Sequence, residues 1–357
     1  MLLDDFDFEL PKTAIALRPA MPRDGARLLS VEPRSPAALI DSRIRDLPTF
    51  LKAGDVLVFN NTKVIPAVLQ GYRLPRDRDA PAVEVSLTLL ERLPDDSWRA
   101  LARPSRRLRA GDVIVLDRRG AQPALAVTGK GQEGEVTVRG LHGEAVEALM
   151  EKYGAMPLPH YIARARAADR CDFADYQTVY ASEAGAIAAP TAGLHFTPDL
   201  MDRIKAAGAR MVFVTLHVGA GTFLPVKTKD LEAHEIHAER CEIREGAAQI
   251  INECRRQGGR LIAVGTTSLR LLETAANEDG NIAPYSGITR LFVRPGHRFK
   301  SATLLLTNFH LPKSTLFMLV CAFCGLDTMR RAYAHAIDAG YRFYSYGDAC
   351  LLFRQVR

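Results

Sequence analysis

The sequence has few of the features that mark a secreted or membrane-bound protein. Its 357 residues contain six cysteines scattered along the chain, a pattern that fits neither a disulfide framework nor paired zinc half-sites. The first ten residues, MLLDDFDFEL, are acidic where a signal peptide is basic. The longest apolar run, residues 316–326, is far shorter than the ~20 residues of a membrane-spanning helix. These absences predict a cytoplasmic protein without a membrane span.

Metal and nucleotide signatures are also missing. The string HEIHAE, residues 234–239, places its two histidines three residues apart instead of the four of the zincin helix, and no third ligand is marked. We therefore predict no metal site there. Gly219 and Gly221 resemble part of a nucleotide-binding loop, but the third glycine is absent. Cys321 and Cys324 lie among apolar neighbours and are expected to be core residues.

The composition is that of an ordinary globular protein. Hydrophobic residues make up 47% and charged residues 25%, which excludes disordered and collagen-like chains. The length favours two domains. A net charge of +6 would suit an anionic partner without requiring one.

The hydrophobic pattern changes character twice along the chain. Residues 83–138 form short β-rich runs separated by Gly, Pro and Asp about every ten residues, which is typical of a small antiparallel barrel. After Thr197, helix and strand patterns alternate. We therefore predict a three-layer α/β domain formed by residues 1–62 and 151–357, with a β-barrel domain inserted at residues 63–150.

Local punctuation predicts individual elements of the α/β part. Thr197 followed by Pro198 predicts a helix start, and residues 210–218 a largely buried strand. Further elements follow from glycine stops and Ser or Thr starts. We expect helices over residues 245–257, 266–272, 314–323 and 327–339, and strands over residues 260–264 and 341–346.

Five strings rich in Gly, Thr, His and Asn follow predicted strands, where open α/β sheets bind ligands. They are APTAGLHFT (residues 189–197), TLHVGAGTF (215–223), VGTTSLR (264–270), TNFHLPKST (307–315) and FYSYGDA (343–349). Glycines permit close approach of the backbone to a ligand, and Thr, Ser and Asn supply neutral hydrogen bonds. Each string alone is equally compatible with simple turn chemistry.

Three histidines and one acid in these strings are candidates for chemistry. His195 and His217 stand beside glycines, and imidazole titrates in the range that suits acid–base catalysis. His310 carries the same ambiguity between catalysis and a loop contact. Asp348 is a candidate acceptor for ligand hydroxyls, with an Asx-turn as the alternative. In the barrel segment, the arginines of RPSRRLR (residues 103–109) would either neutralise phosphates or form a solvated rim.

Together these strings resemble the S-adenosylmethionine:tRNA ribosyltransferase-isomerases of queuosine biosynthesis. The likeness spans the chain and includes DFDFELP (residues 5–11), GDVLVFNNTKVIPA (54–67), PLPHYI (157–162) and YQTVYA (176–181) besides the five strings. The chain departs from the family pattern at His160, at residues 186–187 and at Cys350. None of these positions has an expected chemical role.

The resemblance implies that S-adenosylmethionine donates its ribosyl group to preQ1, a 7-aminomethyl-7-deazaguanine, in the anticodon arm of tRNA. The products are epoxyqueuosine-tRNA, adenine and methionine. The sulfonium acidifies the C5′ hydrogens, so a general base is required, and adenine leaves with a proton supplied by an acid. S-Adenosylmethionine is thus a co-substrate, and no catalytic cofactor or metal is implied. We expect the protein to act as a monomer.

Site residues follow from the resemblance at matching positions. His195 and His217 are the expected acid–base pair, in either order, with Asp348 or Glu239 as alternatives. The expected substrate-binding residues are Asn60, Lys63, Pro190, Thr191, Gly193, Gly219, Gly221, Thr222, Thr266, Thr267, Arg270, Asn308, His310, Lys313, Ser345, Tyr346 and Gly347.

Two other functions compete with this interpretation. An ordinary S-adenosylmethionine methyltransferase would show a glycine-rich loop after its first Rossmann strand, whereas the glycines here come late in the chain. A tRNA-binding module without catalysis would retain its function after mutation of His195.

Overall fold

The chain divides into two units. The computed structural model describes residues 2–33, 39–76, 81–117, 122–219 and 238–355. Residues 1–63 and 174–357 form the first unit, called here the α/β unit, and residues 64–173 form the second, the barrel unit. The barrel unit thus continues past Met150, to residue 173. Helix α1 (Val146–Tyr153) packs Val146, Leu149 and Met150 into the barrel core.

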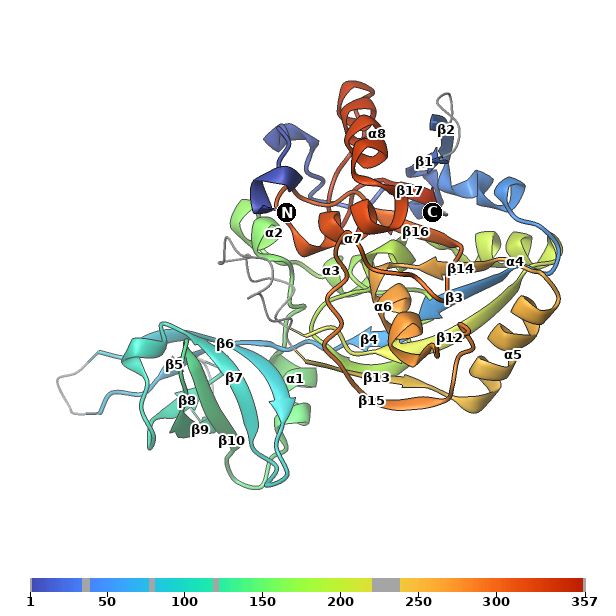
Figure 1. The fold of residues 1–357 in the computed structure, drawn as a ribbon. Helices are drawn as coiled ribbons and strands as arrows, with labels where there is room; N and C mark the ends of the chain where they lie inside the picture. Colours follow the sequence, from blue (N-terminus) through green and yellow to red (C-terminus); the bar gives the residue numbers. More distant parts are fainter. Residues whose placement is uncertain (1, 34–38, 77–80, 118–121, 220–237, 356–357) are drawn as a thin grey trace. The chain divides into compact units, whose positions relative to one another are not determined.

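The α/β unit is built on a nine-stranded mixed sheet (Figure 1). Four neighbouring strands, β12, β3, β14 and β16, are parallel to one another. On one side of them β13 is antiparallel to β12 and β15 to β13, and on the other side β17 is antiparallel to β16 but parallel to β1. The order is β15 (Tyr285–Thr289), β13 (Glu239–Ile243), β12 (Arg210–Leu216), β3 (Val56–Asn60), β14 (Leu261–Val264), β16 (Leu304–Asn308), β17 (Ala349–Phe353), β1 (Arg27–Val31) and β2 (Leu39–Arg43).

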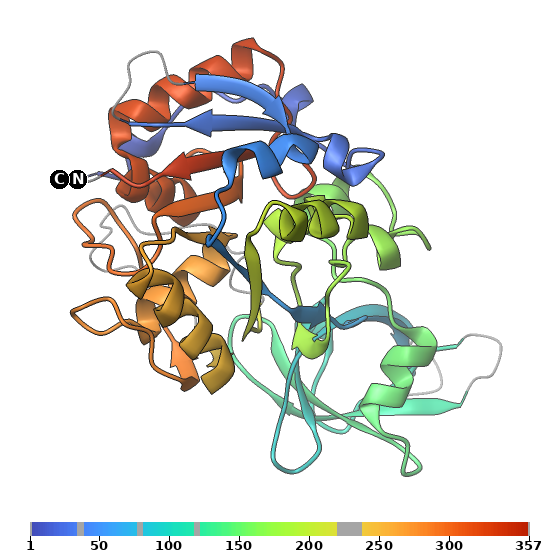
Figure 2. The same cartoon turned by 90° about the vertical axis from the view of Figure 1, so that its right-hand side faces the viewer.

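Both faces of this sheet are buried, which makes the unit three-layered. In β3, Val56 and Val58 belong to one core cluster and Leu57 and Phe59 to another, because successive side chains point to opposite faces. Figure 2 shows helices on both sides of the sheet. The first cluster is covered by α5 (Glu245–Arg256), α6 (Thr266–Ala275), α7 (Thr315–Cys324) and α8 (Leu326–Asp338), and the second by α4 (Pro198–Ala206), η4 (Ile44–Phe50) and η6 (Thr191–His195).

The predicted helix starts are confirmed by their caps. The Thr197 hydroxyl accepts a hydrogen bond from the Leu200 amide at 3.2 Å, and Ser314 accepts one from the Phe317 amide at 3.1 Å. Cys321 and Cys324 are buried in α7 as free thiols, as expected for core residues.

The predicted strand over residues 341–346 is wrong. Tyr344 has a φ of 76°, in the left-handed region that interrupts an extended strand. The Asp348 carboxylate accepts a hydrogen bond from the Arg342 amide at 2.7 Å and closes the segment into a turn. The strand of this region, β17, begins only at Ala349.

The barrel unit contains the predicted antiparallel barrel. Six strands close into a barrel in the order β10, β7, β6, β5, β8, β9, and each neighbouring pair is antiparallel. Their alternate residues form one apolar core, which α1 completes. The strands are β5 (Val68–Arg73), β6 (Val83–Arg92), β7 (Trp98–Arg103), β8 (Val113–Val115), β9 (Pro123–Lys130) and β10 (Glu135–Gly140).

The remaining elements are short. A two-stranded sheet pairs β4 (Thr62–Val64) with β11 (Glu183–Ala186). The other helices are η1 (Leu3–Phe6), η2 (Lys12–Ala14), η3 (Arg23–Gly25), η5 (Ser105–Arg107), α2 (His160–Ala165) and α3 (Asp172–Asp175). Within the described ranges, no helix combines the length and apolarity needed to cross a lipid bilayer.

Candidate active site

A pocket lies where the parallel strands of the α/β unit end. It contains about 750 Å³ of space, counting the part that is open to solvent. Residues that follow β12 and β14, the end of β16 and the turn before β17 line it. The sequence-based expectation of a site at the carboxyl ends of the strands therefore matches the location of this pocket.

The structure brings many of the predicted residues together in this lining. They are Pro190, Thr191, Thr266, Thr267, Arg270, Asn308, His310 and Ser345. Tyr176, Val218, Thr307, Leu316 and Tyr344 also line the pocket and were not predicted. Thr307, Tyr344 and Val218 lie inside strings singled out from the sequence, and Tyr176 begins the string YQTVYA. Leu316 carries no local signal that separates it from core residues.

His195 lies at the end of η6 and is 5% exposed. It is not among the residues that line the pocket, although its neighbour Asn308 is. Its Nε2 is 3.3 Å from the Nδ2 of Asn308, at the end of β16. Burial lowers the pKa of His195 to about 4, although the Asp348 carboxylate opposes the shift. The imidazole is therefore neutral at neutral pH.

Asn308 is fixed by its amide nitrogen. Nδ2 donates to the carbonyl oxygen of Tyr344 at 3.2 Å, which determines the orientation of the side-chain amide. The opposite atom, Oδ1, is buried and has no hydrogen-bond partner among the described residues. A buried acceptor in a pocket wall calls for a donor on the ligand.

His217 follows β12 and is held differently. Its Nδ1 lies 2.9 Å from the Thr62 hydroxyl, and its amide donates to the Arg240 carbonyl at 2.9 Å. Burial and the Arg240 charge lower the pKa of His217, against the opposing effects of Glu183 and Glu242. Within the described ranges, no hydrogen bond joins His217 to His195, and His217 is not among the residues that line the pocket.

His310 and Asn60 have structural partners. His310 lines the pocket, its Nε2 is 3.1 Å from the Thr307 hydroxyl, and burial lowers its pKa to about 3. The Asn60 side chain bonds both the amide and the carbonyl of Leu216, and its Nδ2 is 3.3 Å from the Thr267 hydroxyl. Asn60 thus ties β3 to β12 and to the first turn of α6.

Asp348 organises the turn before β17. It is 2% exposed, accepts hydrogen bonds from the amides of Arg27 and Arg342, and forms an ion pair with the Arg342 guanidinium at 3.3 Å. Gly347 in the same turn leaves no room for a side chain, since a Cβ there would lie 2.5 Å from the Arg342 carbonyl oxygen. These contacts position Ser345 in the pocket wall.

The other predicted residues lie elsewhere. Lys313 forms ion pairs with Asp4 and Asp7, each at 2.9 Å, and Lys63 is exposed on β4. Gly193, Gly219 and Tyr346 are not among the pocket-lining residues. Gly221, Thr222 and the histidines of residues 234–239 lie outside the described residues. Within the described part of the chain, no group of three or more metal-ligating side chains is assembled.

Proteins with similar sequences share one activity by name. Residues 3–352 match the family model described as queuosine biosynthesis protein. The chain belongs to this family. An S-adenosylmethionine:tRNA ribosyltransferase-isomerase from Methylobacterium sp. is 56% identical over 362 residues, which cover 99% of each chain. A second relative with the same name, from Rhizobium rhizogenes, is 54% identical, and the match covers 99% of this chain and 100% of that one.

A solved structure extends the family relation to the fold. The crystal structure of an S-adenosylmethionine tRNA ribosyltransferase from Thermotoga maritima is 32% identical and matches with a TM-score of 0.54. The match covers 97% of this chain and 99% of that one. This chain and the Thermotoga maritima protein therefore share their fold.

Proposed function

We propose that this chain is an S-adenosylmethionine:tRNA ribosyltransferase-isomerase. It transfers and isomerises the ribosyl group of S-adenosylmethionine onto preQ1 in tRNA and releases adenine and methionine. Family membership over nearly the full length supports this function. The single structural observation that supports it best is the pocket of neutral hydrogen-bonding groups at the strand ends.

The imidazoles of His195 and His217 suit proton transfer to and from the substrate. The sulfonium makes the C5′ hydrogens of the ribose acidic, so an uncharged imidazole is the right acceptor. His195 is neutral because it is buried, and His217 is half-buried and thus less strongly desolvated. We assign these two histidines as the acid–base pair, in which the one that accepts the C5′ proton becomes the acid for the later step.

Asp348 acts on His195 through its negative charge. Its carboxylate accepts hydrogen bonds from the Arg27 amide and from the amide and guanidinium of Arg342, so its oxygens are already occupied by donors of the protein. Its charge favours the protonated form of His195. We therefore propose that Asp348 is a positioning residue that stabilises the imidazolium during the reaction.

The barrel unit offers a surface for the anticodon arm. Arg103, Arg106, Arg107 and Arg109 are exposed, and none has a carboxylate partner among the described residues. Other arginines of the unit are paired, for example Arg139 with Asp95 at 2.6 Å. Clustered arginines without counter-charges are suited to RNA phosphates, whose neutralisation makes affinity salt-dependent.

Adenine release tests the proposed function. Purified protein is mixed with S-adenosylmethionine and preQ1-containing tRNA, and adenine and epoxyqueuosine are quantified by chromatography. We expect one adenine per epoxyqueuosine, only with modified tRNA, and a rate at least 100-fold lower for His195→Ala. S-Adenosylhomocysteine as the product would establish a methyltransferase instead. Binding of tRNA without either product would favour a binding module.

A further inference from the structure

The first turn of α6 lies at the pocket. Its N-cap is Gly265, with a φ of 89° and no side chain to cap the helix. The next two residues, Thr266 and Thr267, line the pocket. The first amides of a helix have no partner within the helix, and the helix dipole makes this end attractive to an anion.

Arg270, one turn further along α6, adds a second and independent observation. Its side chain is 10% exposed and lines the same pocket. Nη1 donates to Glu239 at 2.5 Å and Nε donates to the Leu291 carbonyl at 3.0 Å. The remaining atom, Nη2, is buried and has no partner among the described residues. A buried guanidinium donor of this kind requires an acceptor.

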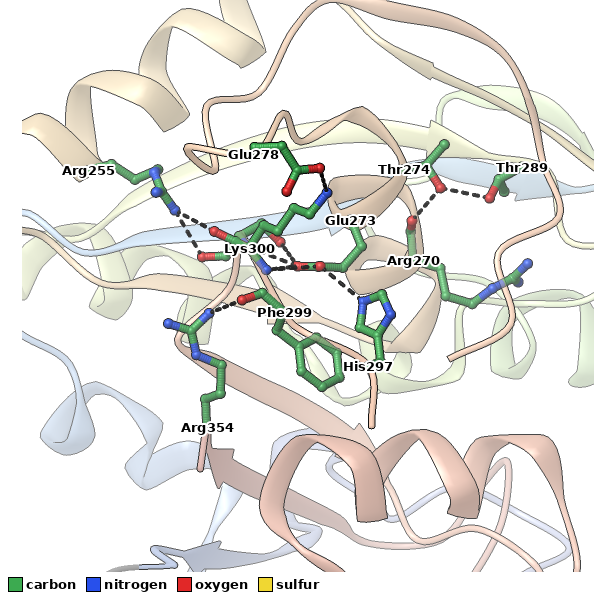
Figure 3. Close-up of polar contacts among 11 residues, drawn as sticks. Arg255, Arg270, Glu273, Thr274, Glu278, Thr289, His297, Phe299, Lys300 and Arg354 are labelled. Carbon is green, nitrogen blue, oxygen red and sulfur yellow. Dashed lines mark hydrogen bonds and ion pairs between the residues drawn. The ribbon is translucent and has the colours of Figure 1, made fainter. Parts of the chain in front are cut away.

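The guanidinium is held rigidly. Glu239 also accepts a hydrogen bond from the Gly219 amide at 3.3 Å, so the carboxylate is itself anchored. The segment that carries Leu291 is tied to α6 by the 2.7 Å contact between the Thr274 and Thr289 hydroxyls (Figure 3). The donor is therefore fixed in place before any ligand arrives.

We propose that this corner of the pocket binds the carboxylate of the methionyl end of S-adenosylmethionine. The inference rests on the proposed function. Of the groups on this molecule, the carboxylate is the only anion, whereas the sulfonium and the ammonium are cations. Arg270 is neutralised by Glu239, so it attracts the carboxylate through a directed hydrogen bond while repelling the sulfonium little.

Two ligands that differ at the methionyl end test the assignment. S-Adenosylhomocysteine keeps the amino-acid end, and 5′-methylthioadenosine lacks it. Calorimetric titration gives both dissociation constants for the full-length protein, for Arg270→Lys and for Arg255→Lys. Arg255 donates to the Lys300 and Ser301 carbonyls, so it supports the same segment without lining the pocket.

We expect Arg270→Lys to raise the dissociation constant of S-adenosylhomocysteine at least tenfold. The dissociation constant of 5′-methylthioadenosine should stay within twofold of that of the unmodified protein. Arg255→Lys should leave the ratio of the two constants unchanged. Thr266→Val replaces one hydroxyl in the same corner of the pocket and should cause a smaller loss of affinity, for S-adenosylhomocysteine alone. This second variant keeps the test informative if Arg270→Lys fails to fold.

Three results would overturn the assignment. Equal weakening of both ligands would give Arg270 a general structural role. An unchanged ratio in both pocket variants would place the carboxylate elsewhere. Loss of affinity for preQ1-containing RNA with intact S-adenosylhomocysteine binding would identify an RNA phosphate as the anion. If neither adenosyl ligand binds the unmodified protein, the proposed function itself fails.

Discussion

The two halves of helix α6 each hold a buried charged side chain, and the hydrogen bonding of these two side chains differs. In the C-terminal half, Glu273 is 7% exposed and accepts hydrogen bonds from His297, the Lys300 amide, and the amide and hydroxyl of Ser301 (Figure 3). In the N-terminal half, Arg270 keeps one donor without a partner among the described residues.

The difference separates structure from function within a single helix. Buried polar groups that are fully paired stabilise a fold, whereas an unpaired one costs free energy unless a ligand completes it. The Glu273 half therefore holds the segment between β15 and β16 in place. The Arg270 half, with Asn308 Oδ1 in the same pocket, is prepared for a substrate.

The largest expected effect comes from removing the saturated carboxylate. Glu273→Ala leaves the amides of Lys300 and Ser301 without their acceptor, and we expect the free energy of unfolding to fall by about 3–5 kcal/mol. Urea unfolding measures the loss. Glu278→Ala is the matched control, because Glu278 is 90% exposed and pairs with the same Lys300 from the surface. Equal losses in the two variants would contradict the comparison.

As the pH falls, the protein should first lose stability through two buried histidines, His195 and His310. The folded-state pKa values of His195 and His310, about 4 and about 3, lie below the usual 6.5, so below pH 6.5 the unfolded chain binds protons that the folded chain does not. Stability is thus complete above pH 6.5, and we expect each histidine to cost roughly 3 kcal/mol by pH 4.5. Unfolding free energies across this range, with His310→Asn alongside, measure the effect. An equally steep decline in the variant would argue against it.

Glu273 should act in a lower pH window. Burial raises the pKa of Glu273, but the hydrogen bonds from His297, Ser301 and the Lys300 amide outweigh it, so the pKa lies below the usual 4.5. A lowered carboxyl pKa gives stability that is present above pH 4.5 and lost as the pH falls through the folded-state value. Glu273→Gln should flatten the stability curve below pH 4.5 and leave the histidine window unchanged.

A moderate effect on stability is expected at Gly193, in the short helix η6 that also contains His195. A Cβ on Gly193 would overlap the Tyr180 hydroxyl and lie 2.9 Å from Thr178 Cγ2, so Gly193→Ala should cost about 2 kcal/mol. Tyr180→Phe removes that hydroxyl, which has no partner among the described residues, and should restore part of the loss. Thermal unfolding of both single variants and the double variant measures the coupling. If Gly193→Ala left the stability unchanged, the side chains of Tyr180 and Thr178 would have to move aside at little cost.

The smallest effect should come from Thr274→Val. The change removes the hydrogen bonds from Thr274 to the Arg270 carbonyl and the Thr289 hydroxyl, at an expected cost of about 1 kcal/mol. Affinity for S-adenosylhomocysteine should stay within twofold, because Arg270 keeps its bonds to Glu239 and Leu291. A tenfold loss of affinity would mean that the two halves of α6 are coupled.

Much of the fold could be predicted because its signals are local. Thr197 and Ser314 cap their helices through contacts three residues away. The short β-rich runs of residues 83–138, separated by turn residues, predict barrel strands without reference to the rest of the chain. The strand predicted over residues 341–346 failed because a distant amide, that of Arg27, shares the Asp348 carboxylate that forms the turn.

For the site, the sequence alone predicted that the strings carrying Thr266, Arg270 and Asn308 follow strands, and hence that these residues meet at one edge of a sheet. Only the tertiary structure decided which of their atoms are used internally. Lys313 is paired with Asp4 and Asp7, more than 300 positions away in the chain, whereas Arg270 keeps a free donor. Local sequence contains no record of such long-range pairing, because a hydrogen bond depends on position in space and not on separation along the chain.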